Sequence, residues 1–276
     1  LGRRMAAPGY DKRSFAYELK RIQQQRQAFR EFRILDADTR AFFITYKYGD
    51  CSYSYLGDPY DDWDPAPFYA LSKNAGAHID EQSYKDRSSM ETVFRTLDRI
   101  ARCTYKVTLF LSGHGSPEVI DLGYDNTVLF LDEVYEAFKA RALLLGRNAG
   151  LRYPALIIMD ACYSYDFADN FRLKWKNDPN LAGYQCPFFI TMANKDAPAS
   201  KTAKVCWHAY AGRMRKGEAF TGADIVREIE PYSFIATVGR MNNDMGIFFS
   251  DGPSEETQAI GMSDLSPAFR SFRSDR

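Results

Sequence analysis

Histidine is scarce in this chain, and cysteine occurs only as scattered single residues. The 276 residues include three histidines and five cysteines, and no two cysteines are spaced as Cys-x-x-Cys. This pattern predicts neither a zinc site nor a disulfide framework, so a reducing compartment, the cytoplasm, is the expected location. Because the chain starts at Leu1 rather than at methionine, this expectation leaves open a targeting segment upstream.

Net charge and long apolar runs are lacking too. The 36 basic and 36 acidic residues cancel, so no overall field draws the chain to nucleic acid or to an anionic membrane. No apolar run approaches the roughly 20 residues that span a bilayer. The first residues also lack the apolar core of a signal peptide. Nucleic acid and membranes are therefore not expected as partners.

Apolar runs alternate with helix-like segments along most of the chain. Hydrophobic residues make up 45% and aromatic residues 15%, enough for one large core. We expect strands at 41–46, 107–115, 127–131, 155–162, 187–193 and 245–249, and helices at 89–101, 132–145, 167–176, 204–216 and 221–230. This alternation predicts an α/β fold, with a mostly parallel six-stranded sheet and helices on both faces.

One of these helices has a clear start and a clear apolar stripe. Ser88 or Ser89 can cap its N-terminus. The buried side is expected to carry four apolar residues, namely Val93, Phe94, Leu97 and Ile100.

Three regions of the chain differ in composition. Residues 1–36 are expected to form a basic extension containing an amphipathic helix from about Asp11 to Leu35. A basic face turned to solvent is the favoured interpretation, and a docking or regulatory arm is the alternative. Residues 37–252 form the main domain, and residues 253–276, rich in Ser, Glu, Pro and Arg, form a loosely ordered tail.

Four carboxylates cluster in the polar loop after the first predicted strand. They are Asp58, Asp61, Asp62 and Asp64. Clustered carboxylates can hold calcium, but the spacing is not that of an EF-hand loop. A solvated loop is therefore favoured over a calcium site, and no cofactor is expected.

One histidine and one cysteine each follow an apolar strand. His114 lies in the Gly-His-Gly sequence at the end of the run 107–115, and Cys162 ends the run 155–162. Because the carboxyl ends of parallel strands meet at one edge of a sheet, we expect the two side chains to lie close together. His78, in a polar stretch, and His208, inside a predicted helix, are expected to have structural roles.

This pair predicts cysteine-dependent acyl transfer. Cys162 would be the nucleophile, at the start of a helix that favours a thiolate, and His114 the acid and base. The backbone amides of Gly115 and Cys162 would form the oxyanion hole. Asp160, two residues before Cys162, projects to the same side and could pair with a cationic substrate side chain. Cys103, Cys186 and Cys206 are expected to be inert.

Two short motifs resemble the caspase-like clan of cysteine peptidases (clan CD), which includes caspases, metacaspases, legumains, clostripain and CHAT domains. The motifs are His114-Gly115-Ser116 and Asp160-Ala161-Cys162-x-Ser164, each following an apolar strand. The resemblance implies a three-layer caspase-like sandwich and a cysteine endopeptidase (a thiol protease) acting on protein or peptide substrates. In several of these families the acid two residues before the nucleophile lines the S1 pocket, which Asp160 would do here.

The resemblance also bears on specificity and control. Asp160 implies cleavage after Arg or Lys, with Asp50 and Asp196 as candidate second residues of the S1 pocket. Control by self-cleavage, by a ligand or by a regulatory protein partner is expected. Self-cleavage is expected in two loops, Tyr48–Asp64 and Lys139–Arg152, of which the second carries basic residues.

Three alternatives stay open. Legumains have a glutamate at the position of Asp160 and cleave after asparagine, so an Asn-specific peptidase is one. The second is a transamidase or ligase of the same clan, which shares the acyl-enzyme but transfers it to an amine. A scaffold that only binds a partner is the third, and the intact His114, Gly115 and Cys162 disfavour it.

Overall fold

The computed structural model of the chain describes residues 20, 23, 24, 27, 29–46, 65–86, 89–123, 128–193, 202–229, 241–242 and 247–248. The strands are β1 (Arg33–Leu35), β2 (Thr39–Thr45), β3 (His78–Ile79), β4 (Lys106–Gly115), β5 (Val119–Asp121), β6 (Val128–Phe130), β7 (Ala155–Ala161), β8 (Phe188–Thr191), β9 (Phe220–Thr221), β10 (Met241–Asn242) and β11 (Ile247–Phe248). The helices are α2 (Ala66–Asn74), α3 (Glu81–Lys85), α4 (Met90–Ala101), α5 (Leu131–Leu145), α6 (Arg147–Arg152), α7 (Ser164–Asn177), α8 (Thr202–Arg213) and α9 (Gly222–Asp224). A 3-10 turn at Pro179–Leu181 and a π-helical turn at Ile225–Ile229 complete the described elements.

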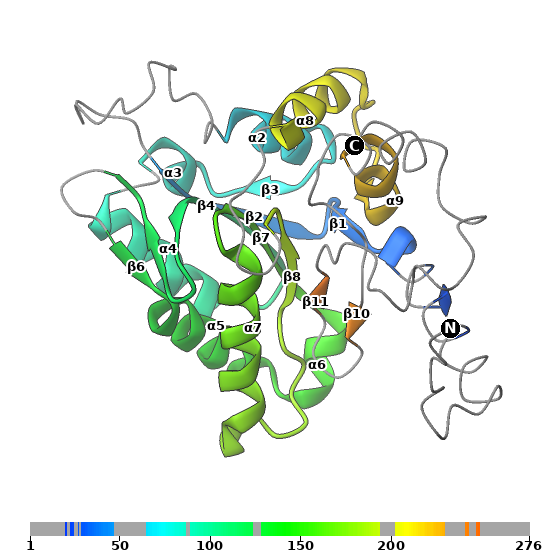
Figure 1. The fold of residues 1–276 in the computed structure, drawn as a ribbon. Coiled ribbons are helices and arrows are strands. Elements are labelled where there is room, and N and C mark those ends of the chain that lie inside the picture. The colour runs from blue at the N-terminus through cyan, green and yellow to red at the C-terminus, as the bar shows by residue number, and fades with distance from the viewer. Residues whose placement is uncertain are drawn as a thin grey trace, which may run out of the picture.

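The strands form one main sheet with the order β10-β11-β8-β7-β4-β2-β3 (Figure 1). Six of these strands run parallel to one another, and the seventh, β10, is antiparallel to its neighbour β11. A hairpin, β5 and β6, continues from the end of β4 by antiparallel pairing. The longest strands, β4 and β7, therefore lie side by side at the centre.

Each face of the sheet carries its own apolar core. On one face, Phe42, Leu109 and Ile157 pack with residues of α4, α5 and α7. On the other face, Phe43 and Phe110 pack with residues of α2 and α8. Strands covered on both faces read as continuous apolar runs, which is why β2, β4 and β7 could be located from sequence.

The α/β class is confirmed, and the mostly parallel sheet is covered by helices on both faces. The strand count was wrong: the main sheet has seven described strands rather than six. Helix α4 begins as predicted, with the Ser89 side chain accepting a hydrogen bond from the Thr92 backbone N–H. Phe94 was wrongly placed in the core, since 46% of it is exposed. No helix in the described ranges is both long and apolar enough to cross a bilayer.

The predicted helix at 11–35 is too long by several residues. Helical residues end at Glu31, and Arg33–Leu35 is strand β1, paired with β9. Ile34 and Leu35 are fully buried, so this long-range pairing overrides the local helical period. Phe29, Ile34 and Leu35, which lie in the segment assigned to an extension, therefore belong to the core.

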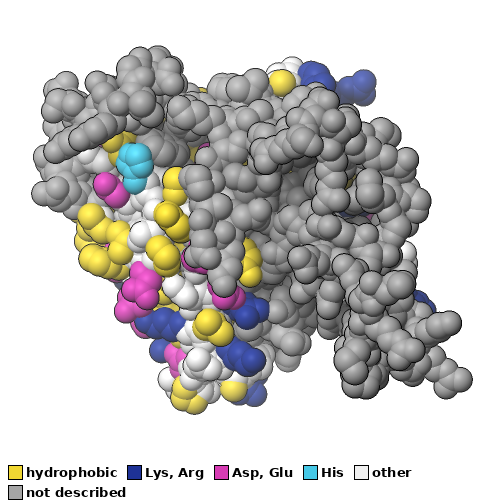
Figure 2. All heavy atoms as spheres, in the orientation of Figure 1, with side chains coloured by type: hydrophobic (Ala, Val, Ile, Leu, Met, Phe, Trp, Pro, Cys, Tyr) yellow, Lys and Arg dark blue, Asp and Glu magenta, His cyan; other side chains and the backbone are white. Residues whose placement is uncertain are grey.

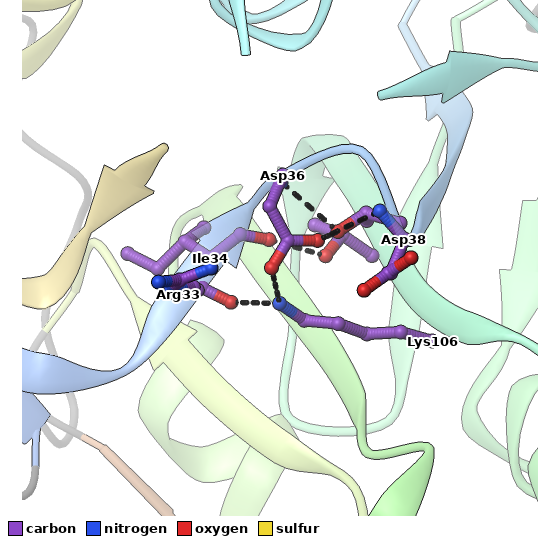
Figure 3. A network of polar contacts seen from close by, with 7 residues as sticks. Arg33, Ile34, Asp36, Asp38 and Lys106 are labelled. Carbon is purple, nitrogen blue, oxygen red and sulfur yellow. Dashed lines mark hydrogen bonds and ion pairs between the residues drawn. The ribbon is translucent and has the colours of Figure 1, made fainter. Parts of the chain in front are cut away.

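A partly buried ion pair fixes the chain after β1 (Figure 3). The Lys106 Nζ donates to the Arg33 carbonyl oxygen and lies 3.0 Å from Asp36 Oδ2. Asp36 also accepts hydrogen bonds from Thr39 Oγ1 and the Asp38 backbone N–H. Burial opposes ionisation of Asp36, but the Thr39 hydrogen bond and the Lys106 charge hold its pKa below the ordinary value. Burial lowers the pKa of Lys106.

Two predicted loops have other outcomes. Residues 139–152, apart from Gly146, are helical, in the last turns of α5 and in α6, so the predicted self-cleavage loop is wrong there. A protease binds its substrate as an extended strand, and a helix does not present one. The loop at Tyr48–Asp64 lies outside the described residues.

Helix α2 begins at Ala66, next to Pro65, where the sequence predicted no helix. Proline is tolerated at a helix start.

A second polar cluster joins α5 to the end of α7. Asp178 accepts hydrogen bonds from Lys139 Nζ at 2.7 Å and from Tyr135 Oη at 2.8 Å. The Lys139 and Tyr135 hydrogen bonds hold the pKa of Asp178 well below its ordinary value of 3.8. The unfolded chain therefore binds a proton here at a higher pH than the folded chain does. The stability that Asp178 confers is present above about pH 4 and is lost as pH falls.

We expect Asp178→Asn to flatten the acid dependence of stability. Urea midpoints at pH 6 and pH 3 should differ less in the variant than in the wild type, because the carboxyl that takes up a proton is gone. Asp98→Asn is the matched control, since the Asp98–Arg102 pair is exposed and such pairs contribute little. An acid dependence equal to that of the wild type in Asp178→Asn would contradict the assignment.

Candidate functional site

His114 and Cys162 lie at the carboxyl ends of two adjacent strands. Strands β4 and β7 are parallel, and their register pairs Ser112 with Asp160 and Gly113 with Ala161. The next residues along the two strands are His114 and Cys162. Neighbouring strands are about 4.8 Å apart, so the backbones of the two residues are close. His114 is exposed and Cys162 is half-buried.

Gly115, the last residue of β4, brings the ends of β4 and β7 into direct contact. A Cβ atom built at Gly115 would lie 2.0 Å from the Cys162 carbonyl oxygen and 3.0 Å from the Ala161 Cβ. Real Cβ atoms do not approach other atoms this closely, so only glycine fits without movement. The structure thus brings together the backbones of three predicted site residues, His114, Gly115 and Cys162.

Cys162 lies in a sharp turn between β7 and α7. The next residue, Tyr163, has φ +55° and is the only described non-glycine residue in the left-handed region. Helix α7 begins one residue later at Ser164, whose hydroxyl accepts a hydrogen bond from the Ala193 backbone N–H at 3.0 Å. The turn is therefore tied to the end of β8. Non-glycine residues in this conformation carry strain and occur often at functional sites.

A row of polar side chains lies one pleat below His114 and Cys162. Thr45, Ser112 and Asp160 are register partners across β2, β4 and β7. They share the face of His114 and Cys162, because side chains alternate along a strand. Thr45 and Ser112 are fully buried, and neither hydroxyl has a hydrogen-bond partner among the described residues. Buried hydroxyls without partners are rare, so these two are an unusual feature of the sheet next to His114 and Cys162, and Asp160 is the half-buried member of the row.

The surroundings of His114 include an aromatic ring. The centroids of the Tyr46 and His114 rings are 5.4 Å apart, with the ring planes perpendicular. On the face viewed in Figure 2, histidine, acidic and hydrophobic side chains lie close together.

The other predicted site residues have mixed outcomes. Asp50, Asp196 and the acidic cluster at 58–64 lie outside the described residues, as does the tail at 253–276. Cys186 is buried, and burial raises the pKa of its thiol, as suits an inert cysteine. Cys103 is half-buried rather than buried. His78 lies on the edge strand β3, away from His114.

One small cavity lies at the opposite end of the sheet. It measures about 20 Å³, and its lining includes Arg141, Ala155 and Trp175. Arg141 is buried and donates to the carbonyl oxygens of Tyr105 and Tyr153, next to the starts of β4 and β7. Burial lowers the pKa of Arg141 to about 10. These contacts give the residue a structural role. Within the described part of the chain, no group of three or more His, Cys, Asp or Glu could hold a metal ion.

Sequence reasoning missed four residues of this site. Thr45 continues the alternation of strand β2, and Ser112 precedes His114 by two residues as Asp160 precedes Cys162. Tyr46 directly follows β2. The fourth, Asp121, pairs with His114 across β4 and β5 and lies in the alternating sequence Val-Ile-Asp-Leu. The sequence shows these local patterns, but it does not show the strand register that brings the four residues together.

Comparisons with protein-family models, with curated proteins and with solved structures find no match to this chain.

Proposed function

We propose that the protein is a cysteine endopeptidase of the caspase-like type, with Cys162 as nucleophile and His114 as general acid and base. The observation that carries the proposal is the close contact of Gly115 with the Cys162 carbonyl, together with the β4–β7 register. The strand-His-Gly-Ser and strand-Asp-Ala-Cys-x-Ser motifs add support. The mostly parallel sheet with helices on both faces is compatible with such a domain.

The proposed reaction proceeds through an acyl-enzyme. The Cys162 thiolate attacks the peptide carbonyl carbon, and the oxygen takes up the electron pair beside the Gly115 and Cys162 amides. The C–N bond then breaks, and His114 protonates the leaving amine. His114 next removes a proton from water, which attacks the thioester and releases the acid and the thiolate. The exposed position of His114 leaves room for water to enter.

The polar row beneath Cys162 supports a basic residue at the cleaved position. Asp160, half-buried on the face of Cys162, supplies a carboxylate that can accept hydrogen bonds from a guanidinium or ammonium group. Charge-assisted hydrogen bonds of this kind are strong. Arginine or lysine is therefore the proposed P1 residue.

Peptide reporters ending in Arg, Lys, Asn or Asp test the proposal. Turnover of the Arg or Lys reporters is the expected result. Asn turnover alone would favour a legumain-like specificity, and Asp turnover would contradict the role of Asp160. Adding an amine nucleophile and searching for ligated product tests the transamidase alternative. Absence of turnover with every reporter would contradict the peptidase.

We expect Asp160→Asn to lower kcat/KM for the Arg reporter by about 100-fold, since removing one partner of a desolvated charge pair costs several kcal/mol. Asp169→Asn is the matched control, because Asp169 lies on the neighbouring helix α7 and pairs with Arg172 at its surface. Steady-state kinetics should show a loss in Asp160→Asn only. Equal losses in both variants would remove Asp160 from the binding site.

A further inference from the structure

The His114 ring is held from one side by Tyr46. The Tyr46 backbone N–H donates to the Ser112 carbonyl oxygen at 2.9 Å, which fixes Tyr46 beside β4. Its ring then meets the imidazole edge to face at a centroid distance of 5.4 Å. Contacts with this geometry are favourable and directional. The tyrosine therefore favours one orientation of the His114 ring.

A glycine turn after β5 determines where the Tyr46 ring lies. Gly123 has φ +86°, and a Cβ atom there would lie 2.1, 2.3 and 2.7 Å from three atoms of the Tyr46 ring. The ring thus packs directly on the Gly123 backbone. Gly123 also donates its backbone N–H to Asp121 Oδ1 at 2.8 Å. The same turn therefore positions the Tyr46 ring and the Asp121 carboxylate.

Asp121 lies directly across from His114. The two residues are register partners in the antiparallel β4–β5 pair, so their side chains project from the same face with Cβ atoms about 5 Å apart. The neighbours of Asp121 in sequence, Ile120 and Leu122, are fully buried on the other face, whereas Asp121 is half-buried. The register therefore places the Asp121 and His114 side chains as neighbours on the same face of the β4–β5 pair.

We infer that Asp121 is a positioning residue for His114. Its carboxylate, held through Oδ1 by the Gly123 amide, orients the imidazole and stabilises the imidazolium that accompanies the Cys162 thiolate. A negative charge near an imidazolium stabilises it by Coulomb attraction, as a carboxylate does in other catalytic triads. The neighbouring segments carry two further acidic residues, Glu118 in the β4–β5 turn and Asp160 on β7. Of these three acidic residues, Asp121 is the register partner of His114.

The variant Asp121→Asn separates charge from shape. An asparagine Oδ1 still accepts the Gly123 hydrogen bond, so the turn and the thermal midpoint should stay within about 2 °C of the wild type. With the Arg reporter, kcat should fall about tenfold or more while KM stays within about twofold. Alkylation of Cys162 by iodoacetamide, in which the thiolate displaces iodide, should slow by a similar factor. Asp121→Glu, which keeps the charge, should recover part of both rates.

The predicted effect of Asp121 on kcat rests on the proposed peptidase function. The alkylation rate of Cys162 does not, so it tests the positioning role of Asp121 separately. If the wild type cleaves no reporter but Cys162 is alkylated more slowly in Asp121→Asn, the peptidase proposal is contradicted and the positioning role of Asp121 stands. Unchanged alkylation and unchanged kcat would overturn the positioning role. The positioning role would also be overturned if the loss of kcat in Asp121→Asn were accompanied by a lowered thermal midpoint and Asp121→Glu did not recover the activity. Asp121→Ser, whose hydroxyl can also accept from Gly123, is the second neutral variant if the Asn variant is unstable.

Discussion

Cys162→Ala is expected to abolish hydrolysis of the Arg reporter, lowering kcat by about four orders of magnitude or more, while the protein stays folded. The physical reason is that no acyl-enzyme forms without the thiolate, and the remaining groups act together and cannot replace it. Continuous reporter assays measure the loss, and circular dichroism checks the fold. Cys162 is half-buried in a turn, so removing its sulfur should cost little stability.

The matched control for this change is Cys103→Ala. Cys103 is also a half-buried free cysteine, but it lies just before β4, at the end of the strand opposite His114. Its removal should leave kcat within about twofold of the wild type. If both variants kept activity, the nucleophile would lie elsewhere. If only Cys103→Ala lost activity, the assignment of Cys162 would be contradicted.

Gly115→Ala is expected to lower kcat/KM by about 100-fold or more and to destabilise the fold by about 1–3 kcal/mol. The added Cβ would lie 2.0 Å from the Cys162 carbonyl oxygen, and both atoms belong to backbone or sit directly on it. The ends of β4 and β7 must therefore move apart. Overpacking costs energy in this range, and a shift of about 1 Å at a reacting group can cost 100-fold in rate.

Gly212→Ala is the matched control for Gly115→Ala. Gly212 lies in helix α8, is exposed, and has no neighbour among the described residues within 4 Å of a built Cβ. Alanine there should stabilise the helix by up to about 1 kcal/mol and leave kcat/KM unchanged. Urea unfolding and reporter kinetics measure both effects. Wild-type kinetics in Gly115→Ala would show that the two strand ends are not in functional contact.

Much of the fold was predictable because central strands and capped helices carry strong local signals. Strands β4 and β7 are covered on both faces, so the sequence shows uninterrupted apolar runs that end at His114 and Cys162. Helix α4 carries a serine cap and a helical apolar period. Local signals of these two kinds are enough to place the candidate dyad at the ends of two core strands separated by a helix.

The misses come from contacts between residues far apart in sequence. Ile34 and Leu35 directly follow a segment with helical periodicity, but pairing of β1 with β9 and burial in the core decide their conformation. Strand β5 is only three residues long, too short for a periodic signal, and Asp121 was missed with it. The row of Thr45, Ser112 and Asp160 depends on register across three strands, which local patterns do not specify.

The central claim is that the His114 imidazole and the Cys162 thiol share one site, and a crystal structure of the protein inactivated by an arginyl chloromethyl ketone tests it most directly. The expected result is a thioether on Cys162 Sγ, with a nitrogen of the His114 ring within about 4 Å of the sulfur or one water away, and the arginine side chain beside Asp160. A label on any other residue, or a His114 ring turned away from Cys162 beyond the reach of one bridging water, would contradict it.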